Sequence, residues 1–453
     1  MSNWINSSVF YHIYPLGFCG APETNDFSLP AVNRLEKVYG WLDHIQWLGA
    51  NALYLGPLFE SSTHGYDTAD YFWLDRRLGT NETLKDLSAE IHRRGMRLVL
   101  DGVFNHSGRD FWAFRDLRQK GQDSAYRGWY HNLRFDQSSP YGDPFSYEGW
   151  NGHLSLVKFN LSNPDVRNHL FEAVTGWVRD YDIDGLRLDA ADCVDLDFWQ
   201  AFGEHCHSLK PDFWLMGEVV HGNYRKWANP EHLDSVTNYE CYKGLYSSLN
   251  DGNYFEIAYA LERQFGKAGI YRDLPLYNFV DNHDVDRVAS LLKNPAHLYP
   301  LYMLLMSMPG VPSIYYGSEW GLPGKRQPAT DAPVRPDLDL DTMIHHAPQA
   351  NLAGTVARLA AIRRNSPALN EGSYSQLRVE SKQFAFLRQQ DGESIVAAFN
   401  SANEAVQFEL KNLPVDGGRL EDLLNPGETF EVRQGKVSLL IPPAWGRLMR
   451  LTH

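Results

Sequence analysis

Four short motifs each place an acidic residue directly after a run of residues typical of a β-strand. They are DGVFNH (101–106), GLRLDAAD (185–192), GEVVH (217–221) and FVDNHD (279–284). In a parallel barrel, the residues that follow the strands collect at one face, where catalytic groups are found. A single Asp after a strand is most often a helix cap. The recurrence of such motifs at four strand ends is therefore what indicates an active site.

The second motif joins a cation to a carboxylate. Alternation along a strand places Arg187 and Asp189 on one face and the leucines between them on the other. An unpaired buried arginine is costly, so we expect these two side chains to contact each other. The guanidinium should lower the pKa of Asp189 and keep it ionised, as a nucleophile must be.

The third and fourth motifs supply two further acids. Glu218 has apolar neighbours in MGEVV and no adjacent cation, so we expect burial to raise its pKa towards that of a general acid. If the strands of Asp189 and Glu218 are neighbours, the two carboxyls can approach the spacing of about 5 Å that retaining glycoside hydrolysis requires. Asp284 should face the same mouth and stabilise an oxocarbenium-like transition state.

Eight short aliphatic or β-branched runs are candidate strands, and helical patterns separate several of them. The runs cover residues 9–14, 52–55, 97–103, 185–189, 214–216, 235–238, 277–280 and 313–316. A helix is expected over 81–94, and Asn163 followed by Pro164 has the cap pattern that begins another. This alternation predicts an α/β fold, a (β/α)8 TIM barrel.

Two stretches depart from the alternation. Residues 106–161 are long, irregular and rich in Gly, Pro, Tyr and Trp, which is typical of an inserted functional domain. From residue 371 the segments alternate at period two around Asp-Gly and Gly-Gly turns, which predicts an antiparallel β domain. We expect the barrel over 1–105 and 162–370, the inserted domain B over 106–161 and the C-terminal β-sandwich over 371–453.

The composition of the chain argues against two classes of partner. The formal charge of −14 would repel a phosphate backbone or an anionic bilayer, so neither nucleic acid nor membrane is expected as a partner. With 13 Trp, 24 Tyr and 23 Phe, the chain is rich in apolar rings that can pack against sugars. The first residues carry no signal-peptide pattern, which predicts a cytoplasmic protein.

Metals, thiols and cofactors have little support in the sequence. Four scattered cysteines are expected to be free thiols. Adjacent positions on a helix point apart, so the run from His205 to His207 is not expected to bind a metal. No phosphate-binding glycine loop is present, and we expect neither a metal ligand set nor a required cofactor.

Taken together, the motifs resemble the α-amylase family of glycoside hydrolases. The resemblance runs from FYHIYP through ALYLGPLFES, HGYDT, the four acidic motifs and YYGSEWG to the β-rich tail. It implies a (β/α)8 barrel with an inserted domain B after strand three and a C-terminal β-sandwich. It also allows a structural calcium ion near the boundary of barrel and domain B.

The resemblance implies a role for each matching residue. Asp189 is similar to the nucleophile, Glu218 to the general acid/base and Asp284 to the transition-state stabiliser. The polar residues that hold the sugar are matched by Arg187, His106 and His283, and the aromatic platform below it by Tyr66. Asp101 and Asn105 fit structural roles, the former pairing with Arg187 and the latter fixing domain B.

At the level of the subfamily, LVKFN (156–160) is similar to the MPKLN motif of neopullulanases, cyclomaltodextrinases and maltogenic amylases. Ala190 and Ala191 after the nucleophile resemble α-1,4-specific members. Three features depart from that group: the N-terminal domain is absent, Asp192 and Cys193 replace a frequent Lys and His, and Val220 replaces a Trp. These changes affect the acceptor side and leave the oligomeric state open, a homodimer included.

The sequence thus predicts a retaining hydrolase of α-1,4-glucosidic bonds in linear or cyclic maltooligosaccharides. One alternative is a glucan transferase or isomerase with the same catalytic residues, because a sugar hydroxyl can replace water as the acceptor. The other alternative is a carbohydrate-binding protein without activity on a shared barrel fold. A product profile on linear, cyclic and polymeric glucans would distinguish the three.

Overall fold

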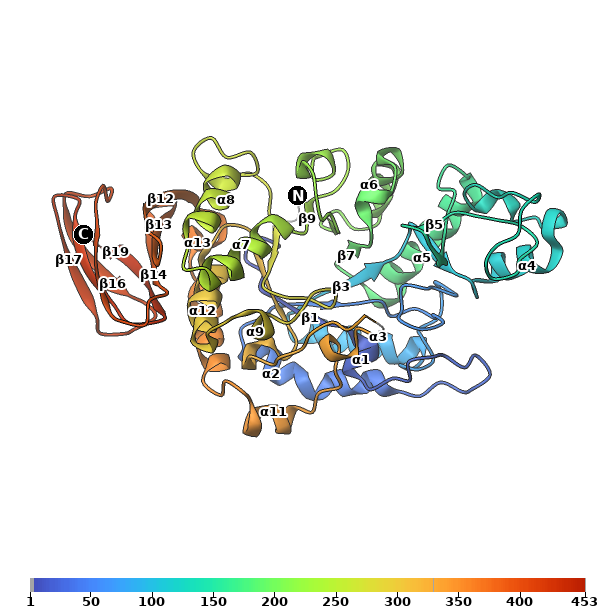
Figure 1. The fold of residues 1–453 in the computed structure, drawn as a ribbon, viewed down its shortest axis with the longest axis horizontal. Helices are drawn as coiled ribbons and strands as arrows, with labels where there is room; N and C mark the ends of the chain where they lie inside the picture. Colours follow the sequence, from blue (N-terminus) through green and yellow to red (C-terminus); the bar gives the residue numbers. More distant parts are fainter. Residues whose placement is uncertain (1–3, 329, 453) are drawn as a thin grey trace.

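The computed structural model describes residues 4–328 and 330–452. At its centre, eight parallel strands form one sheet in the order β10-β11-β1-β2-β3-β7-β8-β9. Their bounds are Phe10–Ile13 (β1), Ala52–Leu55 (β2), Arg97–Gly102 (β3), Gly185–Leu188 (β7), Trp214–Gly217 (β8), Ser235–Val236 (β9), Tyr277–Phe279 (β10) and Val311–Tyr315 (β11). Each of the eight strands overlaps one of the runs expected from sequence, and the predicted (β/α)8 barrel is confirmed (Figure 1).

The barrel closes between β9 and β10 through a short contact. A single parallel bridge joins Thr237 to Tyr277 among the described residues, and the Asn238 amide donates to the Tyr277 carbonyl oxygen at 2.9 Å. The Asn238 side chain then donates to Asn278 Oδ1 at 2.8 Å. We call this contact the β9/β10 seam, because side chains rather than a long ladder hold it together.

Helices connect and cover the strands. The α-helices are α1 (Pro15–Phe18), α2 (Leu42–Trp47), α3 (Asn81–Arg93), α4 (Trp112–Lys120), α5 (Pro164–Tyr181), α6 (Leu196–Leu209), α7 (Tyr239–Asn250), α8 (Phe255–Phe265), α9 (Val288–Leu291), α10 (Leu298–Ser307), α11 (Leu340–His346), α12 (Leu352–Arg364) and α13 (Pro367–Glu371). The predicted cap of α5 is confirmed, since Asn163 Oδ1 accepts from the Asp165 amide at 2.8 Å. Such caps satisfy amides that the first helical turn leaves free.

Between β3 and α5 lies the inserted segment. It holds α4 and a three-stranded antiparallel sheet in the order β4-β6-β5, with β4 at His106–Gly108, β5 at Gly149–Trp150 and β6 at His153–Lys158. Its interior is aromatic: Phe114 packs edge-on against Tyr130 and Tyr147. In Figure 1 this segment stands at one end of the molecule, opposite the C-terminal strands.

The C-terminal strands form two sheets around their own apolar core. The strands are β12 (Ser373–Val379), β13 (Gln383–Gln390), β14 (Glu393–Asn400), β15 (Val406–Leu410), β16 (Gly417–Asp422), β17 (Thr429–Arg433), β18 (Val437–Ile441) and β19 (Trp445–Thr452). β15 and β18 make the smaller sheet, so the predicted C-terminal β domain is confirmed.

The buried Arg388 connects these strands to the barrel, and a second buried arginine, Arg363, joins two barrel helices. Arg388 on β13 donates through Nη1 to the Ser307 carbonyl oxygen at the end of α10, at 2.8 Å, and through Nη2 to the Gly372 carbonyl oxygen at 2.9 Å. Arg363 on α12 donates to the Met306 and Met308 carbonyl oxygens at 3.0 and 3.1 Å. Burial lowers the pKa of both guanidiniums, to about 9 for Arg363.

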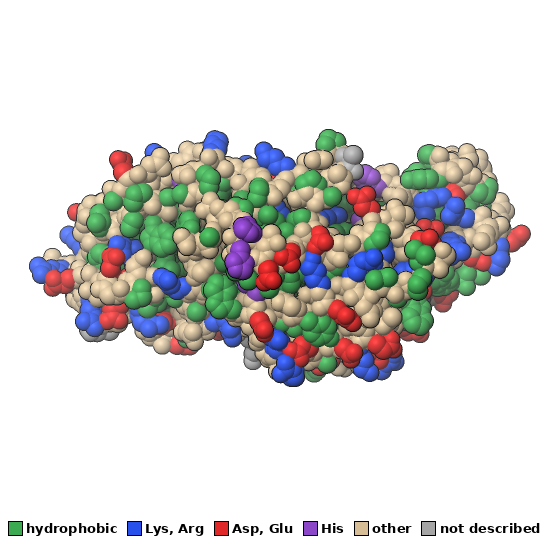
Figure 2. Space-filling model, turned by 90° about the horizontal axis from the view of Figure 1, so that it is seen from below, with side chains coloured by type: hydrophobic (Ala, Val, Ile, Leu, Met, Phe, Trp, Pro, Cys, Tyr) green, Lys and Arg blue, Asp and Glu red, His purple; other side chains and the backbone are tan. Residues whose placement is uncertain are grey.

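On the surface, charges of both signs are interspersed. Figure 2 shows acidic and basic side chains alternating over the face seen from below, without a large area of one sign. In the described part of the chain, no helix is both long and apolar enough to cross a bilayer.

Candidate active site

The first two predicted acids follow neighbouring strands. β7 and β8 are paired in parallel with Leu188 opposite Gly217, so Asp189 and Glu218 come next at the same level. The Glu218 amide donates to the Leu188 carbonyl oxygen at 2.9 Å. Ala190 adopts a left-handed backbone with φ 45°, and this turn directs its amide to Glu218 Oε2 at 3.1 Å.

Arg187 lies at the centre of the site. Its Nη1 is 3.0 Å from Asp101 Oδ1 and 2.8 Å from Asp189 Oδ1, and its Nη2 is 2.8 Å from Glu218 Oε1. The expected pairing of Asp101 with Arg187 is therefore confirmed. Glu218 has no cation beside it in the sequence, but Arg187 from the neighbouring strand contacts it in the structure.

Both carboxyls of this pair hold protons more tightly than isolated ones. Burial raises the pKa of Asp189 well above its usual range; Arg187 opposes this shift, and the Glu218 charge adds to it. Burial likewise raises the pKa of Glu218, and the Asp284 charge adds to that shift while Arg187 opposes it. The lowered pKa expected for Asp189 is thus wrong in direction, whereas the raised pKa of Glu218 is confirmed.

Asp284 behaves in the opposite way. Burial alone would raise its pKa, but the His283 ring and the Arg335 guanidinium outweigh burial and lower it. His283 Nε2 lies 3.0 Å from Asp284 Oδ2, and Arg335 Nη2 lies 3.1 Å from Oδ1. The pKa of Asp284 is therefore lowered, where those of Asp189 and Glu218 are raised. Its Oδ2 is 4.0 Å from Arg187 Nη2, which brings the third predicted acid to the same site.

The sequence-predicted substrate residues line this mouth. Tyr66 OH donates to Asp101 Oδ2 at 3.0 Å, and its ring lies nearly parallel to that of His283 with centroids 5.5 Å apart. His106 Nε2 is 4.0 Å from Asp189 Oδ2. Burial lowers the pKa of His106 to about 3, so the ring is neutral. The backbone carbonyl oxygen of Asn105 accepts from the Phe159 amide at 3.0 Å, which connects the inserted segment to the chain that follows β3.

With this geometry in place, comparison with known proteins identifies the fold family. The sequence matches the α-amylase catalytic-domain family over residues 13–346. The chain belongs to the α-amylase family. The matched stretch contains the inserted segment and all the residues of the acidic cluster. It also contains every barrel strand, apart from the first three residues of β1.

Relatives fall in the group that the LVKFN motif indicated. A cyclomaltodextrinase from Bacillus sp is 34% identical over 88% of this chain and 73% of its own length. A maltogenic α-amylase from Bacillus acidopullulyticus is 29% identical over 96% of this chain and 78% of its own. The ligand-free structure of a cyclic α-maltosyl-(1→6)-maltose hydrolase from Arthrobacter globiformis matches with TM-score 0.83 at 28% identity, covering 99% of this chain and 100% of that one. This α-amylase family member is a glycoside hydrolase.

Two residues of the site were missed from sequence. Arg335 donates to the His283 carbonyl oxygen at 2.9 Å, contacts Asp331 at 3.0 Å and lies 4.6 Å from the centroid of the Tyr14 ring. The Tyr14 ring lies nearly parallel to that of His283, with centroids 5.7 Å apart. Tyr14 lies within the FYHIYP motif and could have been found there. Arg335 lies in irregular chain and had no such signal.

The residues that depart from the neopullulanase group follow Asp189 and Glu218 closely in the sequence. Cys193 is exposed, and its Sγ is 3.5 Å from Asp192 Oδ1. Partial desolvation of its sulfur, together with the charge of Asp192, raises the pKa of the thiol to about 11, so the thiol is neutral. Val220, two residues after Glu218, is 37% exposed and leaves an apolar surface without an aromatic ring. All four cysteines are free, as predicted.

Within the described residues, no three His, Cys, Asp or Glu side chains come close enough together to bind a metal ion. His205 and His207 on α6 bond different neighbours, the Thr175 hydroxyl at 2.9 Å and the Phe213 carbonyl oxygen at 3.1 Å. Calcium can also be bound by amide and carbonyl oxygens, so the calcium ion that the family resemblance allows stays a prediction.

Proposed function

We propose that this protein is a retaining hydrolase of α-1,4-glucosidic bonds in linear or cyclic maltooligosaccharides. The observation that carries the proposal is the pairing of Asp189 and Glu218 at the ends of adjacent strands, with Arg187 contacting both. Neighbouring strands lie about 4.8 Å apart, which suits the short carboxyl separation of a retaining enzyme. Relatives named cyclomaltodextrinase and maltogenic α-amylase support the substrate class.

In the first step, Asp189 attacks the anomeric carbon while Glu218 gives its proton to the leaving glycosidic oxygen. The glycosidic bond breaks as the ester bond to Asp189 forms. Arg187 holds Asp189 Oδ1 at 2.8 Å and leaves Oδ2 as the attacking atom. The reactive state has the proton on Glu218, which the raised pKa of that carboxyl favours, and an ionised Asp189.

In the second step, Glu218 acts as the base. It takes a proton from water, the resulting oxygen nucleophile attacks the anomeric carbon, and the ester to Asp189 breaks. The product keeps the α configuration, and each carboxyl returns to its starting state. Positive charge builds on the sugar ring in both transition states, and the ionised Asp284 lies where it can stabilise that charge.

The remaining residues position the sugar. The ring of Tyr66 supplies an apolar face against which a glucosyl ring can pack. The neutral His106 can donate or accept a hydrogen bond with a sugar hydroxyl group, and the ring nitrogens of His283 offer further hydrogen-bond partners. The inserted segment, rich in aromatic residues, can wall a pocket around a short or cyclic glucan.

A glucan transferase remains the second candidate, because of the residues beside Glu218. The glycosyl-enzyme can be discharged by water or by a sugar hydroxyl. Asp192, Cys193 and Val220 change the surface on which an acceptor sugar would lie, and that surface decides between the two outcomes. The ratio of transfer to hydrolysis products at high maltotriose concentration measures the balance.

Three measurements test the main proposal. An activated fluorinated glycoside should label Asp189 covalently, as read by peptide mass spectrometry. Proton NMR should show the α-anomer first, and a β-anomer appearing first would exclude the two-step mechanism. Finally, kcat/KM should be higher for maltohexaose or a cyclomaltooligosaccharide than for soluble starch; equal or faster cleavage of starch would contradict the substrate choice.

A further inference from the structure

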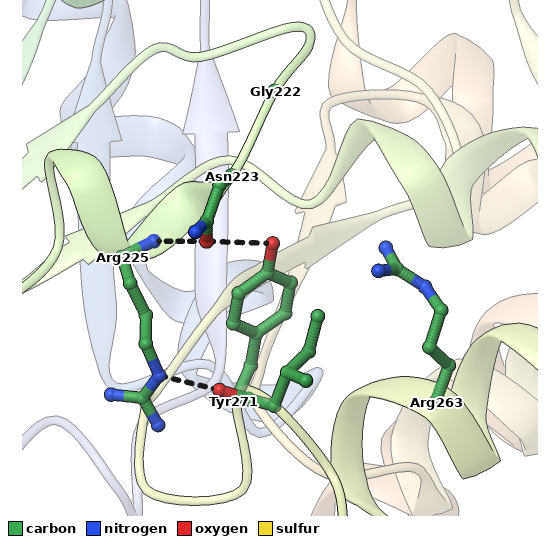
Figure 3. Close-up of a pocket in the computed structure, with 6 residues that line it drawn as sticks. Gly222, Asn223, Arg225, Arg263 and Tyr271 are labelled. Carbon is green, nitrogen blue, oxygen red and sulfur yellow. Dashed lines mark hydrogen bonds between the residues drawn. The ribbon is translucent and has the colours of Figure 1, made fainter.

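A pocket outside the acid cluster opens beside the loop that follows β8. It has a volume of about 540 Å³, within the range of small-molecule sites. Its lining residues come from that loop and from the end of α8 and the chain after it: Gly222, Asn223, Arg225, Arg263, Ile270 and Tyr271. Figure 3 shows Arg225 and Arg263 on opposite sides of the Tyr271 ring.

Two stretches of chain connect this pocket to the catalytic mouth. Gly222 is four residues after Glu218, so the two lie within about 14 Å of each other along even a fully extended chain. On the other side, the half-buried Tyr239 accepts from Asn282 in the FVDNHD motif at 3.3 Å. The next residue, Glu240, binds Arg263 of the pocket.

The direction from the acids to the pocket is that of the leaving group. A general acid protonates the oxygen of the departing sugar, so the departing part of the substrate lies on the side of Glu218. The loop from Glu218 to the pocket exposes Val220, an apolar surface 37% accessible. A glucan chain that leaves past Glu218 along this loop therefore meets the pocket.

The chemistry of the pocket suits a neutral polyhydroxylated ligand. Arg263 donates through Nε to Glu240 at 3.0 Å, and Arg225 donates through Nη1 to Asp273 at 3.3 Å. Each guanidinium is thus neutralised by a carboxylate, yet keeps 38% and 41% of its side chain exposed. Donors and acceptors stand side by side, as vicinal hydroxyls require, and Ile270, 39% exposed, adds an apolar contact.

The pocket is also rigid before any ligand arrives. The Tyr271 hydroxyl accepts from the Tyr224 amide at 3.0 Å, and the two rings stack with centroids 5.1 Å apart. Asn223 Oδ1 accepts from the Arg225 amide at 3.1 Å. A preformed site loses little conformational entropy on binding.

We infer that this pocket is a distal subsite that binds a glucosyl unit of the departing chain, several units from the cleaved bond. The inference rests on the proposed function, because it is the hydrolysis of α-glucans that gives the departing chain its identity. It predicts that long linear maltooligosaccharides gain from the pocket and short ones do not. Longer substrates should also be cut preferentially where their departing end reaches it.

The test fills the pocket and leaves the acids unchanged. In Ile270→Trp the larger side chain occupies the pocket, and Ile344→Trp on α11, where Ile344 is 51% exposed, is the matched control. For maltotriose through maltoheptaose, we expect kcat/KM of the native enzyme to rise at one chain length. That rise should fall about tenfold in Ile270→Trp, the loss of one or two hydrogen bonds, and persist in Ile344→Trp. Equal effects of both variants at all lengths would overturn the inference.

A binding measurement separates this inference from the proposed function. With Glu218→Gln as the common background, calorimetry of maltoheptaose should show weaker binding when Ile270→Trp is added, and so should the smaller change Arg263→Gln. If the native enzyme cleaves no α-glucan while this difference persists, the proposed function fails and the pocket stands. Binding of inorganic phosphate at the pocket in place of maltoheptaose would overturn the assignment to a sugar.

Discussion

A single buried guanidinium, that of Arg187, contacts Asp101, Asp189 and Glu218 within 3.0 Å. Its positive charge offsets the repulsion between these three carboxyl groups, which would otherwise disfavour their close approach. Asp284, only 4.0 Å from the same guanidinium, is lowered in pKa by a different pair of residues. Among the acids at this mouth, Asp284 therefore has a lowered pKa, whereas Asp189 and Glu218 have raised ones.

The two acids of the pair should be indispensable. Asp189→Asn and Glu218→Gln keep volume and remove the ionisable group, so each should lower kcat by roughly 10³ or more while ligand binding persists. Asp197→Asn, an exposed acid on α6 paired with Arg167, is the control and should keep native activity. Native-like rates in either site variant would refute the assignment.

Removing the charge of Asp284 should change the pH dependence of kcat/KM. Its negative charge helps to raise the pKa of Glu218, so in Asp284→Asn that pKa should fall. The protonated acid is then lost at a lower pH, and the alkaline limb of kcat/KM for 4-nitrophenyl α-maltoside should move to lower pH. Asp197→Asn should leave the limb in place; an unmoved or raised limb in Asp284→Asn would contradict the coupling.

The site residues that the sequence revealed share one property: they follow predictable strands. Asp189, Glu218 and Asp284 could be selected because each comes directly after an apolar run. Arg335 could not, because it lies 51 residues from Asp284 in irregular chain, and only the folded chain brings the two together. The pKa of Asp189 was misjudged for a related reason, since burial depends on the whole site rather than on its neighbour Arg187.

At the scale of elements, the side chain of Asp184, the residue before β7, joins several neighbouring elements. Asp184 is 1% exposed and accepts from the Leu98 amide of β3 at 2.9 Å. Arg97, Lys210 and His92 contact its carboxylate at 2.7, 2.8 and 2.9 Å. These contacts lower the pKa of Asp184 despite its burial and join β3, β7, α3 and the chain after α6.

Removing this charge should destabilise the fold in a pH-dependent way. We expect Asp184→Asn to reduce the free energy of unfolding by about 2 kcal/mol at neutral pH, because the cationic partners are partly exposed. The carboxylate has a lowered folded-state pKa, so its contribution is complete above the unfolded-state pKa near 4. The difference between native protein and variant should therefore shrink as the pH falls below 4. Denaturant titrations at several pH values measure it; a difference that grows towards acid would contradict the reasoning.

At the scale of the whole molecule, Arg388 attaches the C-terminal strands to the barrel through the Ser307 carbonyl oxygen, and Arg363 joins α12 to the end of α10 within the barrel. Both guanidiniums are fully buried. A buried charge that bonds to the ends of several segments is strongly destabilising to remove, because the carbonyls it leaves remain without donors. This contact gives a physical reason for the C-terminal domain to unfold together with the barrel.

Arg388→Met keeps an unbranched apolar stem and removes the guanidinium donors. We expect it to lower the melting temperature by several degrees and to split a single calorimetric transition into two, because the barrel and the C-terminal strands lose a shared contact. Arg450→Met on β19, where the arginine is 41% exposed and paired with Glu393, is the control and should melt as the native protein does. An unchanged single transition in Arg388→Met would show that other contacts couple the two parts.

The β9/β10 seam makes one side of the barrel more compliant than the rest. β1 and β2 pair along Phe10–Ile13, whereas the seam depends on one bridge and on the amides of Asn238 and Asn278. Local opening should therefore begin there, and hydrogen exchange of the Asn238 amide should be faster than that of Leu53 in β2. Since Glu218 and Asp284 lie on opposite sides of this line, a bound sugar that contacts both would hold the barrel closed and slow that exchange.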